Sequence, residues 1–372
     1  MTFIHELAGW PDFSWDGGGL AGALATVRHK QGRHLGKMEA LGFELRTEAS
    51  LVTLTDEVVK SSAIEGEHLD PAEVRSSIAR NLGLDVAGLP EPRREVEGIV
   101  EIMLDATRNF EAPITAERLS GWHAALFPTG RSGMSRISVG AWRTAESGPM
   151  RVVSGPIGRE KVHYEAPTAE RLEDEMESFL RWFNAPSEVD PVLKAAIAHF
   201  WFVTIHPFED GNGRIARAIA DMALSQADKT KERFYSMSSG IEAERRQYTI
   251  QLESAQRGNL DITEWLAWFL GCLDRSIDDA NEKLSSVLHK ARLWQQINLN
   301  PVNDRQRKVI NRMFDDFKGH LTTSKYANLA KCSNDTALRD IRELLERRIV
   351  AKNSGGGRST SYRLSEPDEV LA

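Results

Sequence analysis

The chain has 372 residues, which is more than one hydrophobic core usually supports, so we expect two or three domains. Its apolar share of 41% and charged share of 27% exclude a disordered protein, and two cysteines far apart in the sequence exclude a disulfide scaffold. The net charge of −7 argues against general nucleic-acid binding. Because there is neither a signal-peptide pattern nor an apolar run of about 18 residues, we expect a cytoplasmic protein with no membrane partner.

The first part of the chain has the apolar spacing of helices, with Ala, Leu and Val recurring at helical intervals over residues 20–109. Within it, residues 51–66 predict a helix that ends at Glu65, and Gly66 has the position that follows a helix C-cap. Glycines and prolines over residues 83–98 predict a surface loop after these helices.

Helical patterns also dominate residues 112–290, with one strand-like interruption. The segments MRVVSG and KVHYEAP, separated by PIGRE, predict a β-hairpin over residues 150–167. Within the last block, residues 301–364, the stretch 323–364 reads as helix, short turn, helix and Gly-rich hairpin, an order typical of a winged helix-turn-helix. The predicted fold class is therefore mainly α, with a small β-hairpin in the middle and a C-terminal winged helix. The predicted domains cover residues 1–110, 111–290 and 300–372.

The stretch IHPFEDGNGRIAR separates two apolar helical segments at residues 205–217. A helix N-terminus offers unpaired N–H groups and the positive end of the helix dipole, which together bind phosphate. Gly211 and Gly213 come just before or at the start of the second helix, so the backbone can approach an anion without a Cβ between them. Arg214 and Arg217 lie on one face of its first turn, where bound polyphosphate would offset their unfavourable interaction with the dipole.

Two further side chains of this stretch have reactive or ligating groups. Asp210 offers a carboxylate suited to Mg²⁺ held between phosphate oxygens. His206, expected at the end of the first helix, can accept a proton near neutral pH. Taken singly, each of these residues also fits a Gly-rich turn with a capping Asp and surface arginines. Their combination at this spacing favours a phosphate site.

The stretch resembles the signature of the Fic family, H-x-F-x-[DE]-G-N-G-R-x-x-R. Every defined position is matched, by His206, Phe208, Asp210, Gly211, Asn212, Gly213, Arg214 and Arg217. Most members of that family transfer AMP from ATP to a Ser, Thr or Tyr hydroxyl of a protein. The resemblance therefore implies a protein adenylyltransferase that uses ATP and Mg²⁺.

The resemblance also implies a role for each residue. His206 is the general base that takes the proton of the target hydroxyl as this attacks the α-phosphate. Asp210 places Mg²⁺, and Asn212 forms the anion hole with the backbone of the two glycines. Arg214 and Arg217 neutralise the outer phosphates, and pyrophosphate leaves. Such chemistry consists mostly of positioning and charge stabilisation.

The predicted hairpin over residues 150–167 resembles the flap that Fic proteins place over this site. An exposed strand edge can bind an extended peptide by strand addition, so we expect the target protein to be aligned there. Considered without the neighbouring motif, the hairpin would be a structural element with no partner.

Glu65 lies where local rules disfavour it, because a carboxylate in the last turn of a helix meets the negative end of the dipole, at a cost of about 0.3–1 kcal/mol. Residues 61–66 resemble the inhibitory motif [ST]-x-x-x-E-[GN] of Fic proteins. That resemblance implies that Glu65 pairs with Arg217 and restrains the transferase. The alternative is an exposed glutamate at a frayed helix end.

Less specific patterns support three other assignments. Tyr248, in a stretch that resembles the family's helices after the motif, is a candidate for lining the adenine pocket, with a purely structural role as the alternative. We expect His199 to be a structural histidine and not a second base. In the last block we expect Thr336 and Arg339 to face outward, and an excess of basic residues there is compatible with binding DNA, dimerisation or protein docking.

The leading hypothesis is thus an autoinhibited adenylyltransferase that modifies another protein or itself and forms a homodimer, as Fic proteins often do. Two alternatives are left open. One is a DNA-binding regulator whose middle domain senses nucleotide without turnover. The other is a Fic enzyme that removes AMP or transfers another phosphate-linked group.

Overall fold

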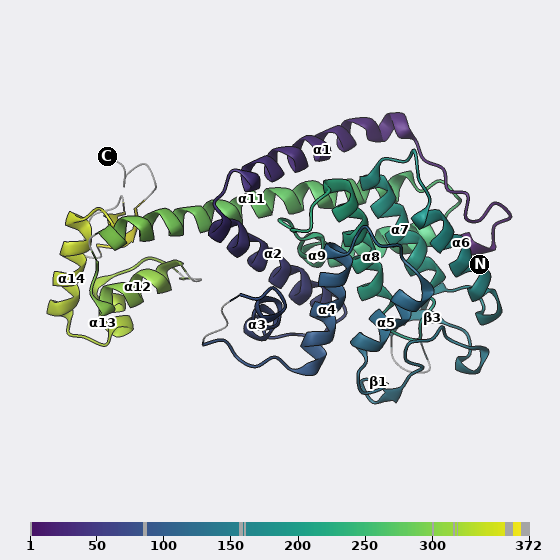
Figure 1. Ribbon diagram of the computed structural model, residues 1–372, viewed down its shortest axis with the longest axis horizontal. Coiled ribbons are helices and arrows are strands. Elements are labelled where there is room, and N and C mark those ends of the chain that lie inside the picture. The colour runs from purple at the N-terminus through teal and green to yellow at the C-terminus, as the bar shows by residue number, and fades with distance from the viewer. Residues whose placement is uncertain are drawn as a thin grey trace. The chain divides into compact units, whose positions relative to one another are not determined.

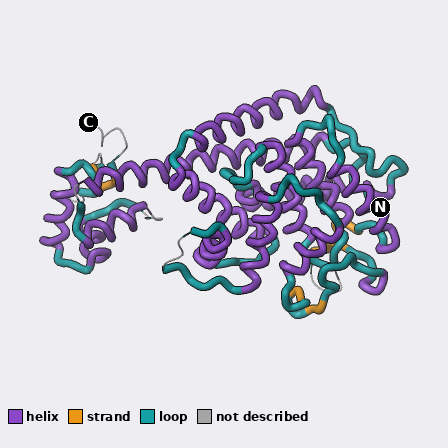
Figure 2. Tube along the Cα trace, in the orientation of Figure 1, coloured by secondary structure: helices purple, strands orange, loops and turns teal. Residues whose placement is uncertain are grey.

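The computed structural model describes residues 2–84, 88–155, 159, 161–299, 301–314, 317, 319–353 and 360–365. Helices dominate this part of the chain, and its strands form three separate two-stranded antiparallel hairpins (Figures 1 and 2). The mainly α prediction is confirmed. The chain forms two compact units, residues 1–281 and 282–372.

The first unit is a bundle of helices that begins after a short 3₁₀ turn, η1. Its helices are α1 (Gly17–Glu39), α2 (Phe43–Ile64), α3 (Pro71–Asn81), α4 (Arg94–Arg108), α5 (Ala116–Leu126), α6 (Leu172–Asn184), α7 (Pro191–Ile205), α8 (Asn212–Asp228), α9 (Met237–Ala243), α10 (Arg245–Gln256) and the first part of α11 (Thr263–Leu299). Aspartates cap several of them; the side chain of Asp190, for example, accepts a hydrogen bond from the N–H of Val192 before α7. Capping residues thus mark helix starts in the sequence itself.

One predicted loop is shorter than expected. The segment over residues 83–98 was predicted as a surface loop, but α4 already begins at Arg94. Its first turn carries Glu95 and Glu97, which interact favourably with the positive end of the helix dipole, and its apolar residues face the core. The helical period that continues through Val96 and Ile99 therefore outweighs Gly98, which we had interpreted as part of the loop.

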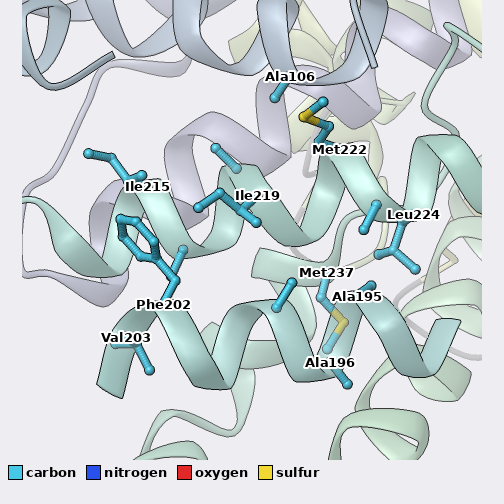
Figure 3. Packing of buried hydrophobic residues seen from close by; sticks show 14 of the residues in the cluster. Ala106, Ala195, Ala196, Phe202, Val203, Ile215, Ile219, Met222, Leu224 and Met237 are labelled. Atoms are coloured by element: carbon cyan, nitrogen blue, oxygen red, sulfur yellow. The ribbon is translucent and has the colours of Figure 1, made fainter. Parts of the chain in front are cut away.

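Helices α7 and α8 lie at the centre of the first unit. α7 is buried along nearly its whole length, and it packs side by side with α8 (Figure 3). Phe202 of α7 and Ile219 of α8 belong to the cluster between them. Because both helices are held by the core, the short loop that joins them has fixed ends.

The N-terminal helices belong to the same core as the middle of the chain. Leu54 and Val58 of α2 lie in one apolar cluster with residues of α7 and α8. At α1, Lys30 bridges Asp274 and Asp278 of α11, at 2.8 and 2.7 Å. Residues 1–110, predicted as a separate domain, are therefore grouped with the middle domain. The boundary between the two units falls inside α11, after residue 281.

Two hairpins precede α7 in the chain and contact the α7–α8 segment in the structure. The predicted hairpin is present, as β3 (Arg151–Ser154) paired antiparallel with β4 (Lys161–Glu165); part of its predicted PIGRE turn lies outside the described residues. A smaller one, β1 (Arg131–Ser132) with β2 (Ser135–Arg136), was not predicted. The hydroxyl of Tyr164 in β4 donates to the carbonyl oxygen of Thr204 at 2.6 Å, which attaches the larger hairpin to the end of α7.

The second unit has its own apolar core. It contains α12 (Asp304–Phe314), α13 (Thr323–Ala330), α14 (Asn334–Glu346) and the hairpin of β5 (Val350–Lys352) with β6 (Tyr362–Leu364). The winged helix stays a prediction, and most of its Gly-rich segment lies outside the described residues. On α14, Arg339 is exposed, whereas Thr336 is half-buried and its hydroxyl meets that of Ser333 at 3.0 Å.

Candidate functional site

The loop between α7 and α8 turns sharply at two residues with left-handed backbones. His206, the residue that ends α7, has φ 52° and ψ 58°, and Gly211, the residue before α8, has φ 79°. At Gly211 a Cβ would lie 2.9 Å from the ring of Phe127 and 3.0 Å from the side chain of Leu126. Glycine is thus required at this turn for conformation and for space.

The side chains of Asn212 and Phe208 hold the loop in shape. The Asn212 amide accepts a hydrogen bond from the Phe208 N–H at 2.9 Å and donates to the Phe208 carbonyl at 2.8 Å. Phe208 is fully buried, and its ring stacks on His123 with centroids 4.1 Å apart. The predicted role of Asn212 in the anion hole therefore needs correction, because its side chain is committed to the loop and only its backbone N–H is available.

The start of α8 presents backbone N–H groups to the space beside the loop. Asn212 and Gly213 are its first two residues, and the first N–H groups of a helix have no acceptor inside it. Asp210 lies next to them: one carboxylate oxygen accepts from the Gly211 N–H at 2.6 Å, and the other accepts from the Ser132 hydroxyl. The geometry suits an anion bound against the helix N-terminus.

A single carboxylate fits Mg²⁺ that is bound mainly by substrate phosphates. No three His, Cys, Asp or Glu side chains of the described residues group closely enough to form a protein-only metal site. Mg²⁺ in nucleotide sites usually takes one or two carboxylates plus phosphate oxygens and water. Asp210 would be that carboxylate, with its position fixed by Ser132.

His206 is oriented so that one ring nitrogen is free for chemistry. Its Nδ1 lies 3.2 Å from the carbonyl oxygen of Val203, and donation to this acceptor leaves Nε2 unprotonated. Burial is the main reason why the pKa of His206 is lower than usual; the Val203 carbonyl acts in the opposite direction. The imidazole is therefore a neutral proton acceptor at physiological pH.

The two arginines of α8 are buried and each meets a carboxylate from the end of α2. Arg217, 2% exposed, pairs with Glu65 at 2.9 Å and donates to the hydroxyl and the carbonyl of Ser61, both at 2.9 Å. Arg214, 7% exposed, pairs with Glu67 at 2.6 Å. The sequence had indicated Glu65 but not Glu67.

One guanidinium nitrogen of each arginine is buried without an acceptor among the described residues. Arg214 Nε and Arg217 Nη1 are buried and meet no acceptor at hydrogen-bond distance within the described part of the chain. Beside Arg214 opens a cavity of about 400 Å³, which Phe127 and Ser132 also line. Buried donors without partners are costly in a protein interior, and a bound phosphate group would satisfy them.

Gly213 allows Glu65 to approach the N-terminus of α8. A Cβ at Gly213 would lie 2.2 Å from the nearer carboxylate oxygen of Glu65. The carboxylate of Glu65 therefore lies against the first turn of α8, between Gly213 and Arg217.

Tyr248 and His199 form a buried pair behind the site. The Tyr248 hydroxyl lies 3.0 Å from His199 Nε2, and the Tyr248 ring contacts Trp265 and Trp268. Burial raises the pKa of Tyr248 to about 12 and lowers that of His199 to about 3. Burial and these contacts are compatible with a structural role for both residues. The assignments of Tyr248 to the adenine pocket and of His199 to a structural role stay predictions.

Several residues around the site could not be found from the sequence. They are Glu67, His123, Ser132 and Arg143. Each reaches the loop from another element, and single Ser, Glu, His or Arg residues at such positions have no distinctive pattern. Only Glu67 had a local signal, because it directly follows the Glu65–Gly66 pair.

Comparison with known proteins finds a family model that matches the part of the chain containing this site. Residues 113–224 match the Fic/DOC family, and residues 3–84 match a domain of unknown function (DUF4172). The chain is 27% identical over 173 residues to the protein adenylyltransferase fic-1 of Caenorhabditis elegans. The aligned residues make up 46% of this chain and 31% of that relative. It is 33% identical over 114 residues to the protein adenylyltransferase Fic of Nematostella vectensis, covering 30% of this chain and 25% of the relative. The chain thus spans about a third or less of the length of these curated relatives.

Two solved structures share the fold. A Fic family protein from Desulfovibrio desulfuricans G20 matches with a TM-score of 0.50 at 21% identity, covering 92% of this chain and 96% of that one. A Fic domain containing signaling protein from Bacteroides thetaiotaomicron matches with a TM-score of 0.52 at 19% identity, covering 70% and 96%. At these identities the likeness establishes the fold alone. No helix among the described residues combines the length and apolar character needed to cross a membrane.

Proposed function

We propose that this protein transfers AMP from ATP to a Ser, Thr or Tyr hydroxyl of a protein, a proposal supported by the match of residues 113–224 to the Fic/DOC family. The observation that carries the proposal is the arrangement around one short loop. His206 ends α7, unpaired N–H groups begin α8, and two buried arginines follow on the same helix. A phosphate-binding helix end thus lies next to a neutral base.

The reaction follows from these groups. His206 Nε2 takes the proton of the target hydroxyl while the hydroxyl oxygen attacks the α-phosphorus of ATP. The bond between the α-phosphorus and the bridging oxygen breaks, and pyrophosphate leaves. The N–H groups of Asn212 and Gly213 and the two arginines stabilise the negative charge of the phosphates. Mg²⁺ held by Asp210 would neutralise phosphate oxygens and align them.

We infer further that the transferase is restrained by Glu65. Its carboxylate pairs with Arg217 and lies against Gly213, where the phosphates of ATP would otherwise bind. Two anions cannot share this helix end without strong repulsion. ATP therefore binds productively only when the carboxylate is removed or displaced.

Replacement of Glu65 tests both parts of the proposal. We expect Glu65→Gly to raise incorporation of label from α-labelled ATP and Mg²⁺ by at least about tenfold, because ATP then binds without the opposing carboxylate. A tenfold change corresponds to about 1.4 kcal/mol. The matched control is Glu65→Gly combined with His206→Ala, which keeps the opened site but lacks the base. Label in the first variant that persists in the second would refute His206 as the base, and no label in either would refute the transferase.

A release assay addresses the alternative that the protein removes AMP from a modified target. Protein labelled by the Glu65→Gly variant is freed of ATP and incubated with wild type; release of AMP would favour a deAMPylating enzyme. Binding of DNA through Arg339 and formation of a homodimer remain predictions from the sequence.

A further inference from the structure

Arg143 lies outside the motif but contacts its first residue. The guanidinium donates from Nε to the carbonyl oxygen of His206 at 2.8 Å, and from Nη2 to the carbonyl oxygens of Pro167 at 2.5 Å and Ile205 at 3.4 Å. Its own backbone N–H donates to the carbonyl oxygen of Pro207 at 2.9 Å. One residue thus binds three consecutive peptide groups around the proposed base.

Burial of the Arg143 cation is unfavourable unless its hydrogen bonds compensate for the loss of water. The residue is 3% exposed, and burial lowers its pKa despite the opposite effect of the Glu170 carboxylate. A buried cation is costly unless its N–H groups are satisfied. Here the acceptors are the last carbonyl groups of α7 and its cap, where the negative end of the helix dipole also favours a cation.

The backbone that Arg143 holds is itself strained. His206 adopts the left-handed region, with φ 52°, which is unfavourable for a residue other than glycine. This conformation ends α7 and turns the chain toward the start of α8. Without bonds to the carbonyls of Ile205 and His206, the segment would gain by relaxing to an ordinary backbone conformation.

We propose that Arg143 is a positioning residue for His206, holding the base in its left-handed turn so that the imidazole faces the phosphate site. This rests on the proposed function and adds a residue to it. The contact with Pro167, which follows β4, joins the same guanidinium to the end of the hairpin expected to align the target. The Arg143 side chain therefore fixes the position of His206 relative to the end of the hairpin.

The charge of Arg143 has a second effect on the base. Besides burial, which is the largest cause, the cation of Arg143 lowers the pKa of His206, whereas Glu65 and Asp210 raise it. These are the charged groups that face the imidazole from the surrounding elements. Loss of the cation should let His206 hold its proton to higher pH, so that the acidic limb of the activity profile moves upward.

Two substitutions separate geometry from charge. In the Glu65→Gly background we expect Arg143→Met to lower kcat about 100-fold, the order of loss that a small misplacement of a reacting group causes, with the KM for ATP changed less than about threefold. Its acidic limb should shift to higher pH. Arg143→Lys keeps the charge but not the planar fork, so kcat should stay low while the acidic limb stays at its original pH.

The control is Arg181→Met, because Arg181 is exposed on α6 and pairs only at the surface with Glu177. It should leave both parameters unchanged. The pKa of His206 is also measured directly by NMR in each variant, which tests the charge effect even if the parent proves inactive. A full kcat in Arg143→Lys, or a rise in KM with unchanged kcat, would overturn the positioning role, whereas loss of the proposed function would appear as an inactive Glu65→Gly parent.

Discussion

Glu65 and Glu67 stand on either side of Gly66 and reach different arginines of α8. Gly66 has φ 86°, a left-handed turn that glycine allows at low cost, and it turns the chain so that both carboxylates face the same helix. The two contacts differ in their surroundings. Arg217 also donates to Ser61, and its partner Glu65, 39% exposed, lies against Gly213. Arg214 meets Glu67, 48% exposed, and the face of Phe127 at 5.2 Å.

We therefore expect Glu67→Gln to raise the proposed AMP incorporation only weakly. Partly exposed ion pairs contribute about 0–1 kcal/mol, which limits the gain in AMP incorporation to about fivefold. The measurement compares Glu67→Gln, Glu65→Gly and the double variant under one set of conditions. Activation by Glu67→Gln equal to that by Glu65→Gly would show that we have ranked the two contacts wrongly.

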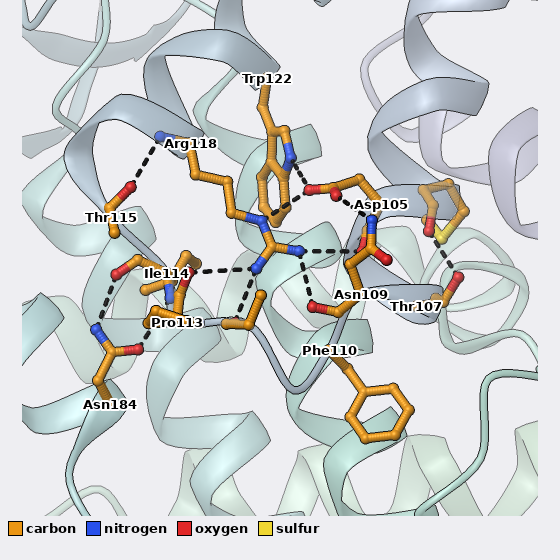
Figure 4. Close-up of polar contacts among 12 residues, drawn as sticks. Asp105, Thr107, Asn109, Phe110, Pro113, Ile114, Thr115, Arg118, Trp122 and Asn184 are labelled. Atoms are coloured by element: carbon orange, nitrogen blue, oxygen red, sulfur yellow. Dashed lines mark hydrogen bonds and ion pairs between the residues drawn. The ribbon is translucent and has the colours of Figure 1, made fainter.

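Close contact of α4 and α5 sets one wall of the first unit. A Cβ at Gly98 would lie 2.0 Å from the backbone oxygen of Ala125, so the helices touch at this point through their main chains. Nearby, Arg118 and Trp122 of α5 both donate to a carboxylate oxygen of Asp105 on α4, each at 2.7 Å (Figure 4). A steric contact and a polar one therefore fix the same pair of helices.

Gly98→Ala should destabilise the first unit by about 1–3 kcal/mol or more, because a backbone oxygen cannot move aside as a flexible side chain can. The matched control is Gly121→Ala on α5, where a Cβ would meet no atom within 4 Å. There alanine should be neutral or stabilising by up to about 1 kcal/mol, since it favours the helix. Urea unfolding measures both, and equal effects of the two substitutions would contradict this account of the contact.

The chain as a whole divides into two units with separate apolar clusters. Every residue of the candidate site lies within residues 1–281, whereas the second cluster is built from residues after 282. Folding of the second unit should therefore depend on its own core, which includes the fully buried Ile341 of α14.

Ile341→Ala should lower the stability of the second unit by about 2–5 kcal/mol, through lost burial and the cavity left behind. We expect calorimetry to show one thermal transition moved to lower temperature and the other unchanged. AMP incorporation by the Glu65→Gly protein should persist with this substitution at temperatures below the shifted transition. A fall in activity there would show that the units depend on one another.

The sequence by itself determined what depends on neighbouring residues. Helical periods predicted which regions are helical, and the spacing between His206 and Arg217 predicted a phosphate-binding turn, because a helix end and its loop are encoded within one short stretch. The pairing of Glu65 with Arg217 was expected only through resemblance to a family. Where local signals conflicted, as at Gly98, the apolar face of α4 prevailed.

Tertiary structure alone decided which distant side chains serve the loop. The Asn212 side chain forms hydrogen bonds with the backbone of Phe208, and the Ser132 hydroxyl donates to Asp210. Arg143 binds the carbonyl of His206, and Tyr248 is buried. Such contacts depend on how helices pack, and a single polar residue has no periodicity that marks its future partner. The local sequence therefore specifies the groups that can bind phosphate, whereas the fold determines which of them are free to do so.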